Sequence, residues 1–266
     1  MAHVPRTPAG VDVTRPAPAR IYDYMLRGSN HFETDVAAAP RILTAVPEIR
    51  DCAWSNRGFH QRAAKWIAEQ GVRQFIDIGS GLPTAGNTHE IARQVIPDAR
   101  VVYIDNDPMV LTHGSALLAT DEDTAVATAD MRHPEEVLGH PQTTRLIDFT
   151  RPVGVLLIAM IHFIDLADRP RIMGRLLGAL PPGSHVTATH VTTDGHLAEA
   201  VAQIERVYAT TPTPIHFRGR AEVARFFDGL ELADPGLVTI DAWRPDPDDP
   251  APPATRWLYG AVGRKS

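Results

Sequence analysis

Through the middle of this chain, segments in which apolar residues follow a strand-like pattern alternate with segments in which they follow a helical one. Short apolar runs typical of β-strands occupy residues 74–78, 100–104, 125–129, 153–159 and 184–190. Amphipathic helical spacings fall between them, at residues 88–95, 108–119 and 170–180. Strands that alternate with helices of ~10–15 residues indicate βαβ units and a parallel sheet. The pattern therefore predicts an α/β fold of the doubly wound type.

The first part of the chain has helical spacing and no strand-like run. Residues 1–19 are rich in Pro, Ala and Arg, without an apolar period, and predict a flexible tail. Helices are expected at residues 20–28, 34–46 and 49–70. Their polar and aromatic residues exceed what packing requires, so residues 20–71 are expected to form a lid over a site. The lid side chains expected in a substrate pocket are Tyr22, Tyr24, Asn30, His31 and Phe32.

The last part of the chain breaks the alternating pattern. Helical spacings at residues 197–208 and 220–227 precede two apolar runs, at 237–243 and 255–262. A Pro- and Asp-rich link with no helix joins these runs, which favours an antiparallel pair added to the parallel sheet. Residues 72–266 are therefore expected to form one ligand-binding domain.

A glycine turn follows the first expected strand. In FIDIGSGLPTAGNTHEIA (residues 75–92) an apolar run reaches Asp77, and Gly79 and Gly81 allow a tight turn before the next helix. Glycine at such a turn lets the backbone pass close to a ligand, because a Cβ would collide with it. Asn87 suits a helix cap as well as a ligand contact. The residues expected to bind a ligand here are Asp77, Gly79, Ser80, Gly81, Leu82, Thr84 and Asn87.

Acidic residues also end the next two expected strands. Asp105 follows the run 100–104 and is placed to accept hydrogen bonds from ribose hydroxyls, whereas Asp107 suits the cap of the following helix. Asp130 ends the third strand and could accept from an exocyclic amine, with Asn106 and Met131 flanking a purine ring. The carboxyl ends of these strands share one edge of the sheet, where open α/β folds bind ligands.

The turn distinguishes two adenine-containing ligands. A dinucleotide fingerprint would need Gly or Ala at its third small position, which here is Thr84, and Pro83 delays the helix. Asp77 would repel a pyrophosphate, whereas the ammonium and sulfonium of S-adenosylmethionine (SAM) are cationic and favour nearby acids. The charges favour SAM over a nicotinamide dinucleotide.

Together these motifs resemble those of class I SAM-dependent methyltransferases. Asp77, Gly79 and Gly81 stand at the D-x-G-x-G positions of the first motif, with Pro83 at its usual third glycine. YIDNDP, TADMR and LLIAMIHFI are similar to the second motif, the third motif and the fourth strand. Over nearly the whole chain, segments such as ARIYDYMLRGSNHFETD, WSNRGFHQRAAKWI and YGAVGRK resemble an actinobacterial S-adenosyl methyltransferase family formerly described as a domain of unknown function. The resemblance implies a mostly parallel seven-stranded sheet with an antiparallel last strand, and SAM as the cofactor.

Five further residues have expected roles at the reacting methyl group or at the cofactor carboxylate. Ala159 and Met160 end the fourth strand, directly beneath its expected position. His162 is a candidate general base with an ordinary pKa suited to neutral pH, and Phe163 is a candidate substrate contact. Arg57 could bind the cofactor carboxylate as a bidentate pair, or form a structural salt bridge.

Composition excludes several other classes. The chain of 266 residues has a formal charge of −6 and no basic stripe, and it lacks the D/N-P-P-Y/F pattern of nucleic-acid amino methyltransferases. Cys52 is the only cysteine, and the histidines lack metal-ligand spacing, so no metal is expected. No secretory signal or apolar run of ~20 residues occurs, which favours a cytoplasmic protein without membrane contact.

The sequence therefore predicts a SAM-dependent methyltransferase that acts on a small molecule, with no nucleic-acid partner. Two alternatives stay open at this point. A SAM-binding regulatory protein without catalysis would share every cofactor residue, because no obligatory base is identified. An NAD-dependent oxidoreductase would share the α/β fold.

Overall fold

A computed structural model of the chain describes residues 10–118, 121–246 and 255–266. Its strands are β1 (Gln74–Ile78), β2 (Arg100–Asp105), β3 (Thr124–Thr128), β4 (Gly154–Leu157), β5 (His185–Val191), β6 (Glu231–Leu232), β7 (Val238–Thr239) and β8 (Leu258–Arg264). They form one sheet in the order β3-β2-β1-β4-β5-β8-β6, with β7 also paired to β8.

Ten α-helices are present in the described residues. Those before and within the parallel part are α1 (Pro18–Met25), α2 (Glu33–Ala45), α3 (Ile49–Glu69), α4 (Thr88–Arg93), α5 (Pro108–Leu117), α6 (Pro134–Gly139), α7 (Pro141–Leu146) and α8 (Arg169–Ala179). After β5 come α9 (Ala198–Tyr208) and α10 (Arg220–Ala224). Short 3-10 turns cover Ile161–Phe163, Arg225–Phe227 and Ile240–Ala242.

The sheet confirms the doubly wound fold expected from the sequence. β1 pairs in parallel with β2 and β4, β2 with β3, and β4 with β5, whereas β8 is antiparallel to β5. Adjacent side chains on a strand point to opposite faces, so Phe75 joins one apolar core and Ile76 the other. Helices on both faces bury these cores, as parallel sheets require.

One expected strand is mostly absent. Within the apolar run 237–243 only Val238 and Thr239 pair with β8, and a 3-10 turn follows them. Trp243 is fully buried, with its ring 5.4 Å from that of Phe59 on α3, so the run is apolar because it packs on a helix. Residues 247–254 of the predicted link lie outside the described residues, as do residues 1–9 of the predicted tail.

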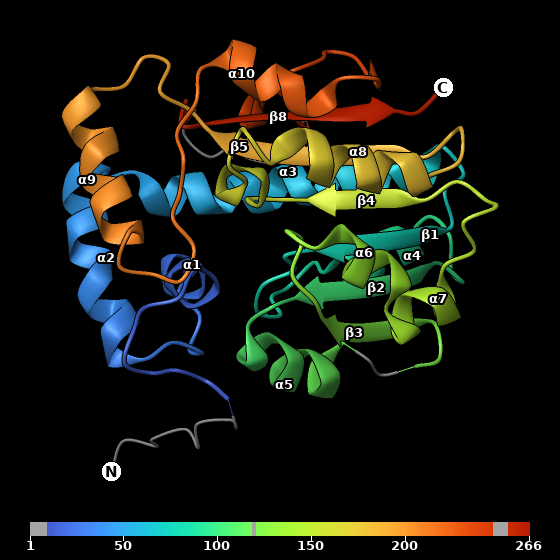
Figure 1. The fold of residues 1–266 in the computed structure, drawn as a ribbon, viewed down its shortest axis with the longest axis horizontal. Coiled ribbons are helices and arrows are strands. Elements are labelled where there is room, and N and C mark those ends of the chain that lie inside the picture. The colour runs from blue at the N-terminus through green and yellow to red at the C-terminus, as the bar shows by residue number, and fades with distance from the viewer. Residues whose placement is uncertain (1–9, 119–120, 247–254) are drawn as a thin grey trace.

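The helices α1 and α2 lie beside α9, although most of the sheet separates them in sequence. In Figure 1 the arrowheads of β2, β3 and β4 point toward this group, which places it at the carboxyl ends of the parallel strands. The long helix α3 runs from this group along the sheet (Figure 1). The sequence predicted the N-terminal helices here, but α9 was not expected among them.

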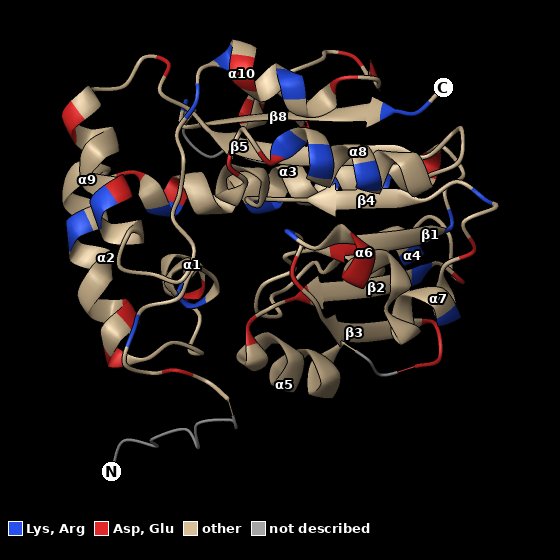
Figure 2. Cartoon of the chain, viewed as in Figure 1, with Lys and Arg blue, Asp and Glu red and all other residues tan. Residues whose placement is uncertain are grey.

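Charged residues of both signs are distributed over the molecule (Figure 2). The basic helix α8 does not form an isolated patch, because Arg169 pairs with Asp228 and Arg171 pairs with Asp168. In the part of the chain that the structure describes, no helix is long and apolar enough to cross a membrane.

Candidate active site

A cavity of about 380 Å³ opens at the carboxyl ends of β1 to β4. β2 lies on one side of β1 and β4 on the other, so the cavity sits where the strand order reverses. Ligands in open α/β sheets bind at this switch point, because connections leave in opposite directions and open a crevice there. Its volume falls in the usual range for small-molecule sites, ~300–1,000 Å³. The cavity is closed on the side away from the sheet by the segment that begins at Gly10, by helices α1, α3 and α9, and by residues 212–217.

The glycine turn after β1 forms part of the cavity wall. Gly79 and Gly81 have φ of +71° and +65°, a region that other residues rarely adopt. A Cβ at Gly79 would collide with the Met160 side chain, whereas one at Gly81 would meet no atom within 4 Å. The Gly81 N–H donates to Asp105 Oδ2 at 2.9 Å, which fixes the turn against the end of β2.

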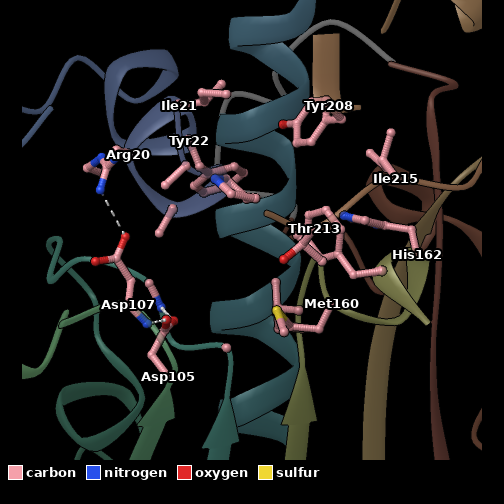
Figure 3. Close-up of a pocket in the computed structure, with 18 of the residues that line it drawn as sticks. Arg20, Ile21, Tyr22, Asp105, Asp107, Met160, His162, Tyr208, Thr213 and Ile215 are labelled. Carbon is pink, nitrogen blue, oxygen red and sulfur yellow. Dashed lines mark hydrogen bonds and ion pairs between the residues drawn. The ribbon is translucent and has the colours of Figure 1, made fainter. Parts of the chain in front are cut away.

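The acids after β2 have separate roles. Asp105 Oδ1 accepts from the Asp107 N–H at 2.9 Å, and burial raises the pKa of Asp105 to about 6. Asp107 accepts from the Met109 N–H at 2.9 Å, which confirms its expected role as the cap of α5. Asp105 thus reaches the cavity, and Asp107 also faces Arg20 at 3.5 Å (Figure 3).

Asp77 lies at the end of a buried polar chain. The Thr88 hydroxyl donates to Asp77 Oδ2 at 2.5 Å, and His60 Nε2 lies 2.8 Å from the same hydroxyl. Burial raises the pKa of Asp77 to about 6 and, with the nearby Arg57, holds the pKa of His60 well below its ordinary value. Since Thr88 gives its proton to Asp77, its oxygen accepts from His60, which leaves His60 Nδ1 as an acceptor without a partner among the described residues.

The end of β3 supplies the third acid. Asp130 receives hydrogen bonds from Asn106 at 3.3 Å and from the Arg132 side chain. Burial opposes ionisation of Asp130, but the hydrogen bonds from Arg132 outweigh it and hold the pKa below its ordinary value. Met131 is buried beside it, and all four residues line the cavity.

The end of β4 brings the expected reaction residues to the cavity. Ala159 has a φ of +56°, and its N–H donates to Thr189 Oγ1 at 2.7 Å. Such strained backbone in a non-glycine residue clusters at functional sites. Met160, His162 and Phe163 follow it and line the same space. Burial, His190 and Arg218 keep the pKa of His162 well below its ordinary value, so its pKa is not near neutrality as the sequence suggested.

Arg20 fastens the N-terminal segment over the cofactor end of the cavity. Its Nε donates to Asp35 Oδ2 at 2.9 Å, and both side chains are almost fully buried. Another nitrogen lies 3.5 Å from Asp107, and two backbone carbonyls of the preceding segment accept from Nη2. Asp35 also accepts from the backbone N–H of Ala17 and of Phe32. The segment is therefore tied both to α2 and to the rim beside Asp105.

Several predicted residues lie outside the cavity. Leu82, Thr84 and Asn87 of the turn do not line it; Asn87 Oδ1 instead accepts from the Thr84 N–H at 3.2 Å. Tyr24, Asn30, His31 and Phe32 are likewise outside, and of the predicted substrate contacts only Tyr22 and Phe163 line it. His31 and the Asn30 N–H both bind Asp23, which holds the loop between α1 and α2.

Arg57 lines the cavity and forms no salt bridge within the described residues, so the structural pair that the sequence allowed is absent there. Its Nη2 donates to the backbone carbonyls of Ala85 and Gly86, at 3.3 and 3.0 Å. It thereby holds the loop that follows the glycine turn.

Other cavity residues had no sequence signal. They include Arg20, His60, Tyr208, Thr213 and Ile215, which come from α1, α3, α9 and the segment after it.

The residues at the strand ends suit SAM. Asp77 and Asp105 are carboxylates at positions for an ammonium and a ribose, and Ser80 Oγ is buried in the wall without a partner among the described residues. The open space at Gly81 leaves room for a ligand against the backbone. No group of three or more potential metal ligands occurs in the described residues.

Comparison with known proteins agrees with this geometry. The model of the S-adenosyl methyltransferase family matches residues 5–266, so the chain belongs to this family. A protein of Thermobifida fusca described as a candidate methyltransferase is 42% identical, with a TM-score of 0.89 over 97% of this chain and 98% of that one. A DUF574-family protein of Streptomyces avermitilis is 39% identical, with a TM-score of 0.89 over 96% and 99%. The comparison with curated proteins gave no match.

The chain is therefore a SAM-dependent methyltransferase with SAM as its cofactor. Membership of this family decides against the two alternatives that the sequence also allowed, a nicotinamide-dependent enzyme and a non-catalytic regulator. The glycine turn agrees with this assignment. Its helix, α4, begins only at Thr88, well after Gly81, so no helix N-terminus stands at the glycines to receive a pyrophosphate.

SAM affinity should fall at acidic pH. Asp77 and Asp105 both have a pKa raised by burial to about 6, so they are ionised above that pH and neutral below it. If Asp77 binds the SAM ammonium, as the sequence predicts, only its ionised form attracts that group, and one pH unit below its pKa leaves about a tenth of it ionised. We expect SAM to bind about tenfold more weakly at pH 5 than at pH 7.5, as measured by calorimetry. Asp77→Asn should bind SAM weakly at both pH values, and the part of the pH dependence that is due to Asp77 should disappear. A dissociation constant unchanged between these pH values would contradict this assignment.

Proposed function

We propose that the protein transfers the methyl group of SAM to a small molecule that binds in the upper part of the cavity. One observation supports this most directly. The same cavity that reaches the acids of β1 to β3 continues past Ala159 and Met160 to a space among α1, α3 and α9. The acceptor would occupy that space, with the N-terminal helices as a lid, while the strand ends hold the donor.

Each acid at a strand end would bind a different group of the donor. Asp77 would bind its ammonium, Asp105 its ribose hydroxyls and Asp130 its exocyclic amine. When bound, SAM supplies a methyl group already activated by a positively charged sulfur, so the protein has mainly to align the acceptor and exclude water.

His162 would align the accepting atom. Its lowered pKa keeps the imidazole neutral, and its Nδ1 is buried without a partner among the described residues. A neutral imidazole accepts a hydrogen bond from a hydroxyl or amine and orients its lone pair toward the methyl group.

Replacement of His162 should slow methyl transfer and spare donor binding. Losing one buried hydrogen bond costs ~1–3 kcal/mol, so we expect His162→Ala to lower kcat about 5- to 150-fold. His162→Gln, which retains a hydrogen-bonding group, should restore part of that loss. The measurement is kcat and KM for the acceptor beside the dissociation constant for SAM. A normal kcat in His162→Ala would exclude this role.

The function itself is tested with SAM labelled in its methyl group. The purified protein is incubated with the small-molecule, protein and nucleic-acid fractions of its source cells. We expect label in the small-molecule fraction. Label confined to protein or nucleic acid would contradict a small-molecule acceptor. The acidic net charge and mixed surface charges support this expectation, and the cytoplasmic location remains a prediction from the sequence.

A further inference from the structure

The two ends of the cavity differ in charge. Its charged side chains belong to the segment around Arg20, to Arg57 and to the strand ends. The opposite end, among α1, α3, α9 and the segment after α9, has no charged lining residue in the described chain. The apolar residues there include Ile21, Met25, Ile204, Ile215 and Phe217. Figure 3 shows Tyr208, Ile215 and His162 across α3 from Arg20 and Asp107.

The ionisable groups at this apolar end are neutral. Burial raises the pKa of the Cys52 thiol to about 12 and raises the pKa of the Tyr22 and Tyr208 phenols. The imidazole of His162 is also uncharged, because its pKa is lowered. A carboxylate, phosphate or ammonium bound here would lose its hydration, which costs several kcal/mol. The nearby cations Arg57 and Arg218 already donate to backbone carbonyls and to His190. The space therefore favours an uncharged molecule.

Aromatic rings form one wall of this end. The rings of His162 and Phe163 lie 4.4 Å apart at 69°, and those of Phe163 and Tyr208 lie 6.1 Å apart at 37°. Ring centroids ~4.5–7 Å apart are those of favourable aromatic pairs, so a further planar ring can pack on this wall.

Polar atoms at this end include a hydrogen-bond acceptor without a partner. Tyr22 donates its only hydroxyl proton to the Ala53 carbonyl at 3.1 Å, so Asn56, 3.0 Å from the Tyr22 oxygen, must present its NH₂ group there. The Asn56 Oδ1 atom is then left as an acceptor, and it is buried without a partner among the described residues. Asn56 is itself 1% exposed and lines the cavity. The Tyr208 hydroxyl, which also has no hydrogen-bond partner in the described chain, points toward the same space (Figure 3).

We propose that the methyl acceptor is an uncharged planar aromatic molecule that carries a hydroxyl group, and that Asn56 and Tyr208 select it by hydrogen bonds. This inference rests on the proposed function. The hydroxyl oxygen forms a bond to the methyl carbon while the carbon–sulfur bond breaks, its electron pair going to sulfur. In the bound acceptor the single hydroxyl proton is donated to Asn56 Oδ1. As the ether forms, this proton passes to the neutral His162 imidazole and from there to solvent. The products are an aryl methyl ether and S-adenosylhomocysteine.

The full-length protein loaded with S-adenosylhomocysteine tests this inference by calorimetry with three probes. They are 2-naphthol, its charged counterpart 2-naphthoate, and 2-methoxynaphthalene, which has no donor. We expect 2-naphthol to bind at least about tenfold more tightly than either of the others. No binding of 2-naphthol, or equal binding of 2-naphthoate, would overturn the proposed acceptor class.

Variants test the two selecting residues. Tyr208→Phe and Asn56→Leu should each weaken 2-naphthol about 2- to 12-fold and leave the affinity for S-adenosylhomocysteine unchanged. Tyr259→Phe removes a tyrosine hydroxyl outside the cavity and should bind all probes like the unmodified protein. If Tyr208→Phe and Asn56→Leu bind 2-naphthol as tightly as the unmodified protein does, their proposed role is overturned. Failure to label any small molecule would instead contradict the proposed function, while a chain that methylates one and prefers 2-naphthoate contradicts only this inference.

Discussion

Replacing Asp105 with alanine is expected to weaken SAM binding by ~1–3 kcal/mol, which corresponds to about 5- to 150-fold in the dissociation constant. Two losses combine in this variant. The ribose hydroxyls lose their acceptor, and the N–H groups of Gly81 and Asp107 lose the carboxylate that holds the turn. Asp105→Asn keeps one acceptor oxygen, so its affinity for SAM should lie between that of the unmodified protein and that of Asp105→Ala.

The measurement for Asp105→Ala is calorimetric titration with SAM and with S-adenosylhomocysteine. Both ligands carry the ribose, so both should weaken to a similar extent. Asp98→Ala is the matched control, because Asp98 is an exposed acid that pairs with Arg73 far from the cavity. An Asp105→Ala protein that binds SAM like the control would remove Asp105 from the cofactor site.

Replacing Arg20 with methionine should produce the largest loss of stability. Arg20 and Asp35 are 3% and 0% exposed, and methionine keeps the aliphatic volume while leaving the buried Asp35 carboxyl without its partner. Breaking a buried pair on one side costs ~3–5 kcal/mol. If the whole fold bears that cost, the melting temperature falls by about 6–20 °C.

Calorimetry and limited proteolysis measure this effect together. If α1 and α2 unfold locally before the sheet does, the loss of stability appears as faster proteolytic cleavage within residues 10–45 and not as a lower melting temperature. Arg73→Met is the control, since the Arg73–Asp98 pair is 57% and 66% exposed and such pairs contribute ~0–1 kcal/mol. A melting temperature and cleavage rate for Arg20→Met equal to those of Arg73→Met would show that the buried pair does not secure the segment.

The sheet and the donor end of the cavity were predictable because local sequence specifies them. An apolar run that ends in an acid, followed by glycines with positive φ, needs no distant contact to be interpreted. Asp77, Gly79, Gly81 and Asp105 therefore lie at the cavity where the sequence placed them.

The acceptor end was predictable only in part: Tyr22, His162 and Phe163 line it as expected, but other residues could not be placed from local pattern. Tyr208 lies on α9, and only the packing of α2 against α9 brings it to the cavity. Tyr24, His31 and Phe32 share the polar and aromatic character of cavity residues, yet His31 is bound to Asp23 and Tyr24 packs edge-on against His31. A helix pattern shows which residues are polar or aromatic, but which of them face a cavity depends on the partner helix.

The placement of α1 and α9 has a consequence for how this family diversifies. Neither helix belongs to a βαβ unit, so substitutions of Ile21, Met25 or the α9 residues that line the cavity leave the strand ends unchanged, whereas Arg20 on α1 also contacts the rim beside Asp105. Acceptor choice can then change during evolution without loss of SAM binding or of the sheet core. The relatives at 42% and 39% identity share this fold, with TM-scores of 0.89. A shared fold does not imply a shared substrate. The side chains at the positions of Asn56, Tyr208 and Ile215 are therefore where orthologues with one acceptor and paralogues with another should differ.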